Sequence, residues 1–375
     1  MNLSAIAKLV GILALTGSLP VHCADKGPTD LLADKADAVV VGEVQSGQQT
    51  GNSAAFVLSI VRTIKGDLAA GDTINVSGTT GGQVNRTLQG DYGLWFLRKS
   101  AAQWTFLSTS LSLGEGFLEG AGYLPLVKTI SPLSVNTAMP PSTASDQMAV
   151  ELVAAMQGYT SQSQLSALTR EFLGLGESAL LPDLYHSLRA SPNQELRFIG
   201  VRALLWGDEA PSALAEIANN LDLVADLRAN FFVVPAVCGI RNPDPGAVQS
   251  LGKITSSADV AMGRCAATAL MYIHTKATLP FLAQLLGSGD AQTRESAMRG
   301  LSRFVDNLPI TTQDNTINAT ALVPQGPSIY RTADTDKYSL STTSLSHARY
   351  SEAAYLQFWG AWWASVKDAL SGQSR

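Results

Sequence analysis

The sequence predicts an α+β protein in which a small all-β domain precedes a stack of helix pairs. Two observations carry this prediction. Short runs of β-branched and aromatic residues, separated by Gly, Asn, Asp and Ser, fill residues 36–123. From residue 180 to residue 307 a different pattern returns several times, with apolar residues, a proline, a turn and an arginine in the same order.

The first 23 residues have the features of a secretory signal peptide. One basic residue, Lys8, precedes an apolar run from Leu9 to Leu19, and Pro20 ends the run. The run is too short for a membrane span, and no later segment is long enough. We expect cleavage near Cys23 or Ala24; lipidation of Cys23 is the less favoured alternative, because the residues before it are not small. The mature protein is therefore expected to be secreted or periplasmic.

Residues 30–126 are predicted to form the small β domain. About five or six short strands in this length predict a barrel or a sandwich. The runs at 38–44, 64–66 and 93–97 resemble netrin-like or oligonucleotide-binding-type barrels of secreted bacterial proteins. Three aromatic residues of this domain are candidates for an exposed binding platform: Tyr92, Trp95 and Trp104.

Residues 127–145 are rich in Pro, Ser and Thr and show no periodicity, so we predict a flexible linker between two separately folding domains. The helical domain is expected to span residues 146–308. Its first two helical stretches, within residues 146–174, have less regular apolar stripes and are predicted to cap the stack.

The repeats are aligned on four arginines that stand 31, 36 and 30 positions apart: Arg197, Arg228, Arg264 and Arg294. Each copy predicts two helices with one apolar stripe each, for example Leu227, Phe231, Val234 and Cys238 on the second helix of the second copy. Neither helix of a pair can bury its stripe alone, so neighbouring pairs are expected to stack. Pro235 falls inside that second helix and should kink it.

The order Leu-Pro-x-Leu, turn, Arg, seen from Leu181 and again from Leu279, resembles the HEAT-like repeats of phycocyanobilin lyases. The resemblance covers about 130 residues, or about four repeat units, and implies an α-solenoid. It also implies a scaffold, because such repeats more often hold partners than catalyse reactions.

The arginines of the repeats are predicted to be structural. Asn193 and Asp290 each stand four residues before an arginine, so a guanidinium can meet a turn acceptor in its own helix or bridge to the next unit. The alternative is a row of anion-binding groups. On the same arginine alignment, Cys238 and Cys265 would lie about 13 Å apart along parallel helices and are predicted not to form a disulfide.

No catalytic, cofactor-binding or metal-binding residue is predicted. The sequence lacks the motifs of zinc proteases, serine hydrolases, P-loops and paired CxxC sites. The histidines of the mature chain, His186, His274 and His347, are far apart in sequence and are expected at the surface or its rim. The glycine-rich segment 114–122 is predicted to be a turn, because its spacing does not fit a phosphate loop.

Two segments close the chain. Residues 309–346 are polar and are predicted to form an irregular loop. Residues 347–372 are predicted to form a helix that caps the apolar end of the stack, with Phe358 pointing away from its stripe. The stripe consists of Tyr355, Trp359, Trp362, Trp363, Val366 and Leu370.

These observations favour an exported scaffold that binds another macromolecule, with a protein as the first choice of partner. A polysaccharide or cell-wall polymer bound through exposed aromatic residues is the second hypothesis, and an unrecognised enzyme such as a chromophore lyase is the third. The net charge of -5 argues against a nucleic-acid partner.

Overall fold

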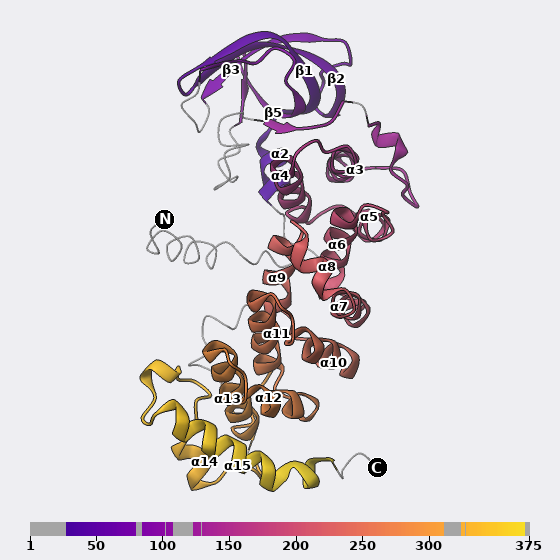
Figure 1. Ribbon diagram of the computed structural model, residues 1–375. Helices are drawn as coiled ribbons and strands as arrows, with labels where there is room; N and C mark the ends of the chain where they lie inside the picture. Colours follow the sequence, from indigo (N-terminus) through magenta and orange to yellow (C-terminus); the bar gives the residue numbers. More distant parts are fainter. Residues whose placement is uncertain are drawn as a thin grey trace. The chain divides into compact units, whose positions relative to one another are not determined.

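A computed structural model shows a small N-terminal β barrel followed by helices, which confirms the predicted α+β class (Figure 1). The structure describes residues 28–79, 85–101, 103–107, 123–128, 130–310, 324–326 and 328–371. The predicted signal peptide, residues 1–23, and the glycine-rich segment 114–122 lie outside these ranges. The chain divides between Ala203 and Leu204 into two units, called here the barrel unit and the helical unit, and each is described by itself.

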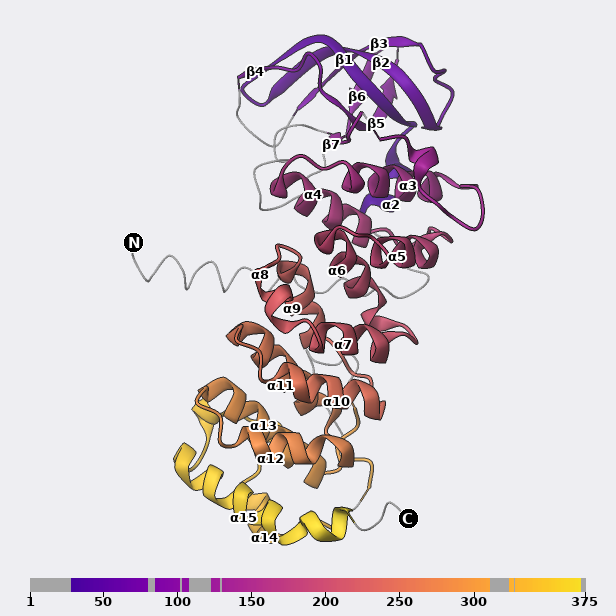
Figure 2. The same cartoon turned by 45° about the vertical axis from the view of Figure 1, so that its right-hand side comes forward.

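The barrel is closed by five strands. β1 pairs with β2, β2 with β3, β3 with β6, β6 with β5, and β5 again with β1 (Figure 2). Only the β3–β6 pair is parallel among these five contacts. Closure removes the free edges of the sheet, so the domain is a barrel and not a sandwich. The strands are β1 (Ala38–Thr50), β2 (Ser53–Lys65), β3 (Thr73–Thr79), β4 (Arg86–Thr87), β5 (Tyr92–Ser100), β6 (Gln103–Phe106) and β7 (Tyr123–Pro125).

The barrel interior is filled by alternating residues of its strands. On β2 the buried side chains are Ala54, Phe56, Leu58 and Ile60, which follow the period of two expected for a strand with one core face. β5 differs, because its residues 93–97 are all buried.

Four helices and the short helix α2 complete the barrel unit: α2 (Pro28–Lys35), α3 (Ala144–Gln157), α4 (Gln162–Leu173), α5 (Leu181–Arg189) and α6 (Gln194–Ala203). α3 packs against α4 and α5, and α5 against α6. α5 and α6 approach closely at Gly200, where a Cβ atom would lie 2.4 Å from the backbone nitrogen of Arg189. A larger residue at Gly200 would therefore force the two helices apart.

The segment predicted as a flexible linker packs against the helices. Val135 is buried, and Val127 and Ile130 fill the space beside Gly158 at the end of α3. On the barrel, Arg62 of β2 donates two hydrogen bonds, of 2.7 and 2.8 Å, to the carboxylate of Glu151 on α3. Residues 127–145 thus lie inside one compact unit and do not separate two domains. Composition did not reveal these contacts, because the few apolar residues of the segment are spread among Pro, Ser and Thr.

Asp146 fixes the start of α3. Its buried carboxylate accepts hydrogen bonds from the backbone of Ser142, Thr143 and Ala179 and from the Ser178 hydroxyl. Burial alone would raise the pKa of Asp146, but these hydrogen bonds outweigh it and lower the pKa to about 2. The ionised carboxylate therefore stabilises this junction at neutral pH.

The helical unit contains two layers of helices. α7 packs against α10 in one layer, and α9, α11 and α13 lie side by side in the other (Figure 1). α10 packs against α11 and α12 against α13, which joins the layers. The bounds are η2 (Leu204–Trp206), α7 (Ala210–Ala218), α8 (Leu221–Asp226), α9 (Asn230–Cys238), α10 (Pro245–Ile254), α11 (Val260–Ile273), η3 (Lys276–Thr278), α12 (Leu279–Leu285) and α13 (Ala291–Val305).

Hydrogen bonds connect the N-termini of successive helices in the second layer. The Asn230 amide of α9 donates to Asp259, the N-cap of α11, at 2.6 Å. Arg264 of α11 pairs with Asp290, the N-cap of α13, at 2.6 Å. The prediction that a repeat arginine bridges to the next unit is thus confirmed for Arg264.

The first part of α9 differs from the prediction. The chain forms α8, becomes extended at Leu227 and starts α9 only at Asn230, so a stripe counted from Leu227 is in the wrong register. Val233, Ala236 and Val237 are the buried residues of α9. Pro235 lies inside the helix as predicted and is exposed. Phe231, predicted to be in the core, is 63% exposed.

The two cysteines form a disulfide, contrary to the prediction. The Cα atoms of Cys238 and Cys265 are 4.1 Å apart. The arginine alignment gave the wrong distance because Arg228 precedes α9. The hydrogen bond between Asn230 and Asp259 shows that these two residues lie at the same height along their helices. Cys238 lies eight residues after Asn230 and Cys265 six residues after Asp259, so along parallel helices they differ by only about 3 Å of rise.

The last helix, α15 (Glu352–Ser371), packs against α12 and α13. Its buried residues are Tyr355, Trp359, Trp362 and Leu370. The segment before it contains a short helix that the sequence did not predict, α14 (Ala333–Lys337), and a 3-10 turn, η6 (Leu345–His347). Phe358 stacks on Tyr338 at the end of α14, with ring centroids 4.4 Å apart, so the residue expected to point away from the stripe anchors this segment.

No helix in the described part of the chain combines the length and apolar character needed to cross a membrane.

Candidate functional site

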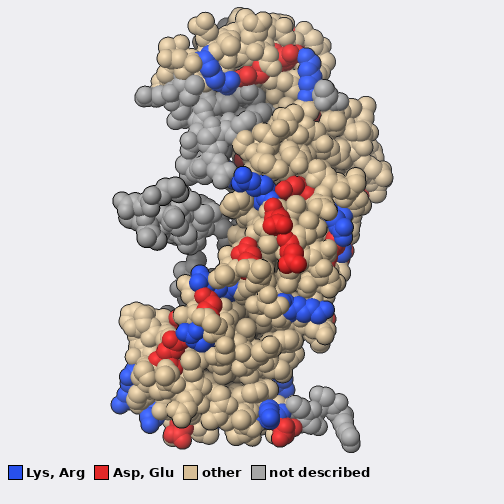
Figure 3. All heavy atoms as spheres, viewed as in Figure 1, with Lys and Arg blue, Asp and Glu red and all other residues tan. Residues whose placement is uncertain are grey.

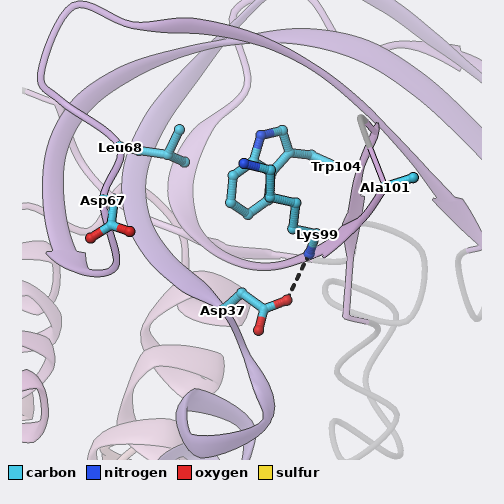
Figure 4. Close-up of a pocket in the computed structure, with 6 residues that line it drawn as sticks. All are labelled: Asp37, Asp67, Leu68, Lys99, Ala101 and Trp104. Carbon is cyan, nitrogen blue, oxygen red and sulfur yellow. Dashed lines mark hydrogen bonds between the residues drawn. The ribbon is translucent and has the colours of Figure 1, made fainter.

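A cavity of about 510 Å³ opens beside Trp104 on the barrel (Figure 4). Trp104 comes from β6, Lys99 from the end of β5, and Ala101 from the turn between these strands. Asp37, Asp67 and Leu68 complete the lining: Asp37 precedes β1, and Asp67 and Leu68 follow β2. The cavity is therefore formed where a strand start, a loop and a hairpin turn meet.

Hydrogen bonds hold the lining in place. The Asp37 carboxylate accepts the backbone N–H of Lys99 at 2.8 Å. The Lys99 ammonium lies 5.4 Å from the centre of the Trp104 ring, within the range of a cation–π contact. The carbonyl of Leu68 accepts from the Thr63 hydroxyl, and the side chain of Leu68 packs on the barrel core.

The cavity combines an aromatic ring with charged groups of both signs. Trp104 is half-buried, whereas Asp37, Asp67 and Lys99 are exposed. A ligand with a flat apolar face could lie on the indole while its hydroxyl groups donate to the carboxylates. This combination suits a sugar ring, which has C–H bonds on its faces and hydroxyl groups around its edge.

The three aromatic residues predicted as a platform are not brought together. Trp95 is fully buried in the barrel and its Nε1 donates to the carbonyl of Gly42 at 3.1 Å. The Tyr92 hydroxyl accepts from Arg62 at 3.2 Å. Only Trp104 lines the cavity. The alternating pattern of a strand could not tell which of Trp95 and Trp104 is buried, because five consecutive residues of β5 are buried and do not alternate.

A second candidate lies on the helical unit, where two apolar side chains are exposed. Phe231, at the start of α9, is 63% exposed and Val260, at the start of α11, is 54% exposed. The hydrogen bond from Asn230 to Asp259 joins the helix ends directly before them. The Arg228 guanidinium carbon lies 5.9 Å from the centre of the Phe231 ring. We call Phe231, Val260 and Arg228 the apolar patch. Phenylalanine and arginine are enriched at protein interfaces, and Val260 extends the exposed apolar surface.

Two of the four repeat arginines pair with carboxylates of the following helices and are not arranged as anion ligands. Arg264 forms an ion pair with Asp290. Arg294 forms one with Glu352, at the start of α15, with Nε 2.7 Å from a carboxylate oxygen. Arg264 lowers the pKa of Asp290 well below its usual range through its hydrogen bonds to the carboxylate. Both arginines therefore serve the packing of successive helices.

The three histidines do not converge. His186 and His347 are exposed, and His347 hydrogen-bonds to the Ser344 hydroxyl. His274 is buried, contrary to the surface position predicted for it, and one of its ring nitrogens hydrogen-bonds to the Leu308 carbonyl at 2.7 Å. Within the described ranges, no three His, Cys, Asp or Glu side chains come together as a metal site would require.

Charged side chains are sparse on the face shown in Figure 3, where they form small groups of mixed sign between wide uncharged areas. The described part of this face has no extended basic patch of the kind that binds a nucleic-acid backbone.

Comparisons with protein-family models, with curated proteins and with solved structures found no match to this chain.

Proposed function

We propose that this protein is an exported scaffold whose helices form a HEAT-like solenoid and bind another protein through the apolar patch. The observation that carries the proposal is the exposure of Phe231 and Val260 on neighbouring helix ends. Water contact with large apolar groups is unfavourable, and burying them against a partner would recover that free energy. Arg228, whose guanidinium carbon lies 5.9 Å from the centre of the Phe231 ring, adds a positive charge to this surface.

The packing of the helices supports a scaffold role. Helices from successive sequence repeats lie side by side in two layers, which is the arrangement that gives repeat proteins an extended surface. Export is supported by the sequence of residues 1–23 and by the disulfide, because such bonds persist in oxidising compartments. The proposal assigns the protein no catalytic step.

The patch is tested by crosslinking and then by affinity. A photo-crosslinking residue at Phe231 should yield one discrete adduct in the native host, whereas the same residue at Ile329, which is 84% exposed in the same unit, should not. With the partner purified, Phe231→Ala is expected to weaken binding at least about tenfold, because truncating an interface anchor costs more than about 1 kcal/mol. The melting temperature should not change, since Phe231 is exposed. Equal affinity of wild type and variant would refute this site.

A second candidate function is favoured by the Trp104 cavity, which suits an oligosaccharide. Trp104→Ala is expected to weaken oligosaccharide binding, measured by calorimetry, at least about tenfold through loss of the stacking face. Trp363→Ala, which truncates a half-buried tryptophan elsewhere, is the matched control and should not affect it. Phe231→Ala should also leave oligosaccharide binding intact. Unchanged oligosaccharide affinity of the Trp104→Ala variant would refute the cavity as the binding site.

A further inference from the structure

Two arginines, one fully buried and one partly buried, lie against one aromatic ring in the helical unit. Arg303, on α13, is 0% exposed. Its guanidinium carbon lies 4.7 Å from the centre of the Tyr272 ring on α11. Arg241, three residues after the end of α9, has its guanidinium carbon 4.1 Å from the centre of the same ring. Two guanidinium groups therefore share one aromatic ring inside the protein.

The guanidinium of Arg303 has no hydrogen-bond acceptor. None of its three nitrogens has a partner among the residues that the structure describes. Arg241 uses one terminal nitrogen for the carbonyls of Cys238 and Ile240, at 2.8 Å each, and its Nε has no partner. A buried guanidinium stays charged in proteins, so it needs acceptors to replace water. The aromatic contact offsets only a part of this cost, because it satisfies no N–H group.

The neighbouring charges increase the need for an acceptor. Arg299, four residues before Arg303 in the chain, adds a positive charge; it forms a 4.0 Å ion pair with Glu295, and its Nε has no partner among the described residues. Burial lowers the pKa of Arg303 and lowers that of Arg241 to about 10. The acidic residue nearest to Arg303 in sequence is Asp306, whose carboxylate accepts a hydrogen bond from the Ser339 hydroxyl at 2.9 Å. In the described ranges, no carboxylate forms an ion pair with Arg241 or Arg303.

His274 does not supply the missing acceptor. Its Nε2 lies 2.7 Å from the Leu308 carbonyl, so this nitrogen carries the proton and donates. Among the described residues, Nδ1 has no hydrogen-bond partner, and burial lowers the pKa of the ring, which favours the neutral form. Among the described residues, no acidic side chain therefore compensates the positive charges of Arg241 and Arg303.

We propose that Arg303 and Arg241 hold a small oxyanion beside Tyr272, in the layer formed by α9, α11 and α13. The guanidinium fork matches two oxygens of a phosphate, sulfate or carboxylate, which a spherical anion cannot satisfy equally well. The ligand is a small free ion and not a side chain of a partner, because a fully enclosed Arg303 is out of reach of another macromolecule. Binding would join three helices and stabilise the helical unit.

The test measures the melting temperature of the full mature chain at constant ionic strength. Phosphate is expected to raise it along a saturation curve, by about 5 °C at one hundred times the dissociation constant. Arg303→Met should abolish this shift and Arg241→Met should reduce it. Arg349→Met is the matched control: Arg349 is exposed and also lies over a tyrosine, 5.6 Å from the Tyr350 ring, and the full shift should remain.

Acetate, sulfate and chloride distinguish the kinds of anion. Saturable shifts with phosphate and sulfate, with or without acetate, support an oxyanion site. A shift of the same size with chloride overturns the proposal, as does an unchanged phosphate shift in Arg303→Met. If Arg303→Met does not fold, calorimetry of phosphate binding to the wild-type chain decides, with one site per chain as the expected result and no binding as the contrary one.

Discussion

Replacing Trp359 by Ala is expected to lower the free energy of unfolding of the helical unit by about 3–5 kcal/mol, the usual cost of removing a fully buried tryptophan. Trp359 is 0% exposed. Its ring contacts Trp362 edge-on, with centroids 5.5 Å apart, and its Nε1 donates to the Tyr338 carbonyl at 3.1 Å. Alanine would leave both a cavity and a carbonyl without its donor, so packing and hydrogen bonding are lost together.

Trp363→Ala provides the comparison for this prediction. Trp363 is on the same helix, four residues after Trp359, but it is only half-buried, so the same truncation should cost much less. Urea denaturation of both variants, followed by circular dichroism, gives the two free energies. Removal of residues 351–375 should lower the melting temperature at least as much as Trp359→Ala. Equal effects of the two tryptophan variants would mean that α15 does not cover the core formed by α12 and α13.

The fold class was predictable because burial follows simple periods in much of the chain. The alternation of Phe56, Leu58 and Ile60 marks a barrel strand, and Leu181, Leu184 and Leu188 mark one face of α5. Closure of the barrel was not predictable, because the pairing of β1 with both β2 and β5 depends on residues far apart in sequence.

The errors in the helical unit share one cause. Aligning Arg228 with Arg264 assumed that both lie at the same place in their helices, but Arg228 precedes α9 and Arg264 lies inside α11. This displacement placed Phe231 in the core and separated Cys238 from Cys265. A single-sequence pattern cannot detect it, since the break at Leu227 has no proline or glycine to mark it.

The candidate sites were harder to predict than the fold. Trp95 and Trp104 have the same chemistry, and only the tertiary structure shows that one is in the core and the other lines a cavity. Nothing in the sequence around Arg303 marks its side chain as buried, because its contact with the ring of Tyr272 joins α13 to α11.

Reduction of the disulfide is expected to destabilise the helical unit by about 3.5 kcal/mol, the chain-entropy value for a loop of 27 residues. The bond links the end of α9 to the first turns of α11, and it spans a region in which α9 contains Pro235 and so lacks one backbone hydrogen bond. Without the link, α9 has only Val233, Ala236 and Val237 as buried anchors. We expect this helix to lose its packing first.

The measurement is urea denaturation of a chain that begins at Ala24, with and without a reductant, so that Cys238 and Cys265 are its only cysteines. The variant with both cysteines replaced by Ala should match the reduced wild type and should be insensitive to the reductant, which controls for effects of the reagent. Thiol titration of the denatured, unreduced wild type should find no free thiol. Two free thiols in a chain of full stability would contradict the bond, because the helices would then hold together without it.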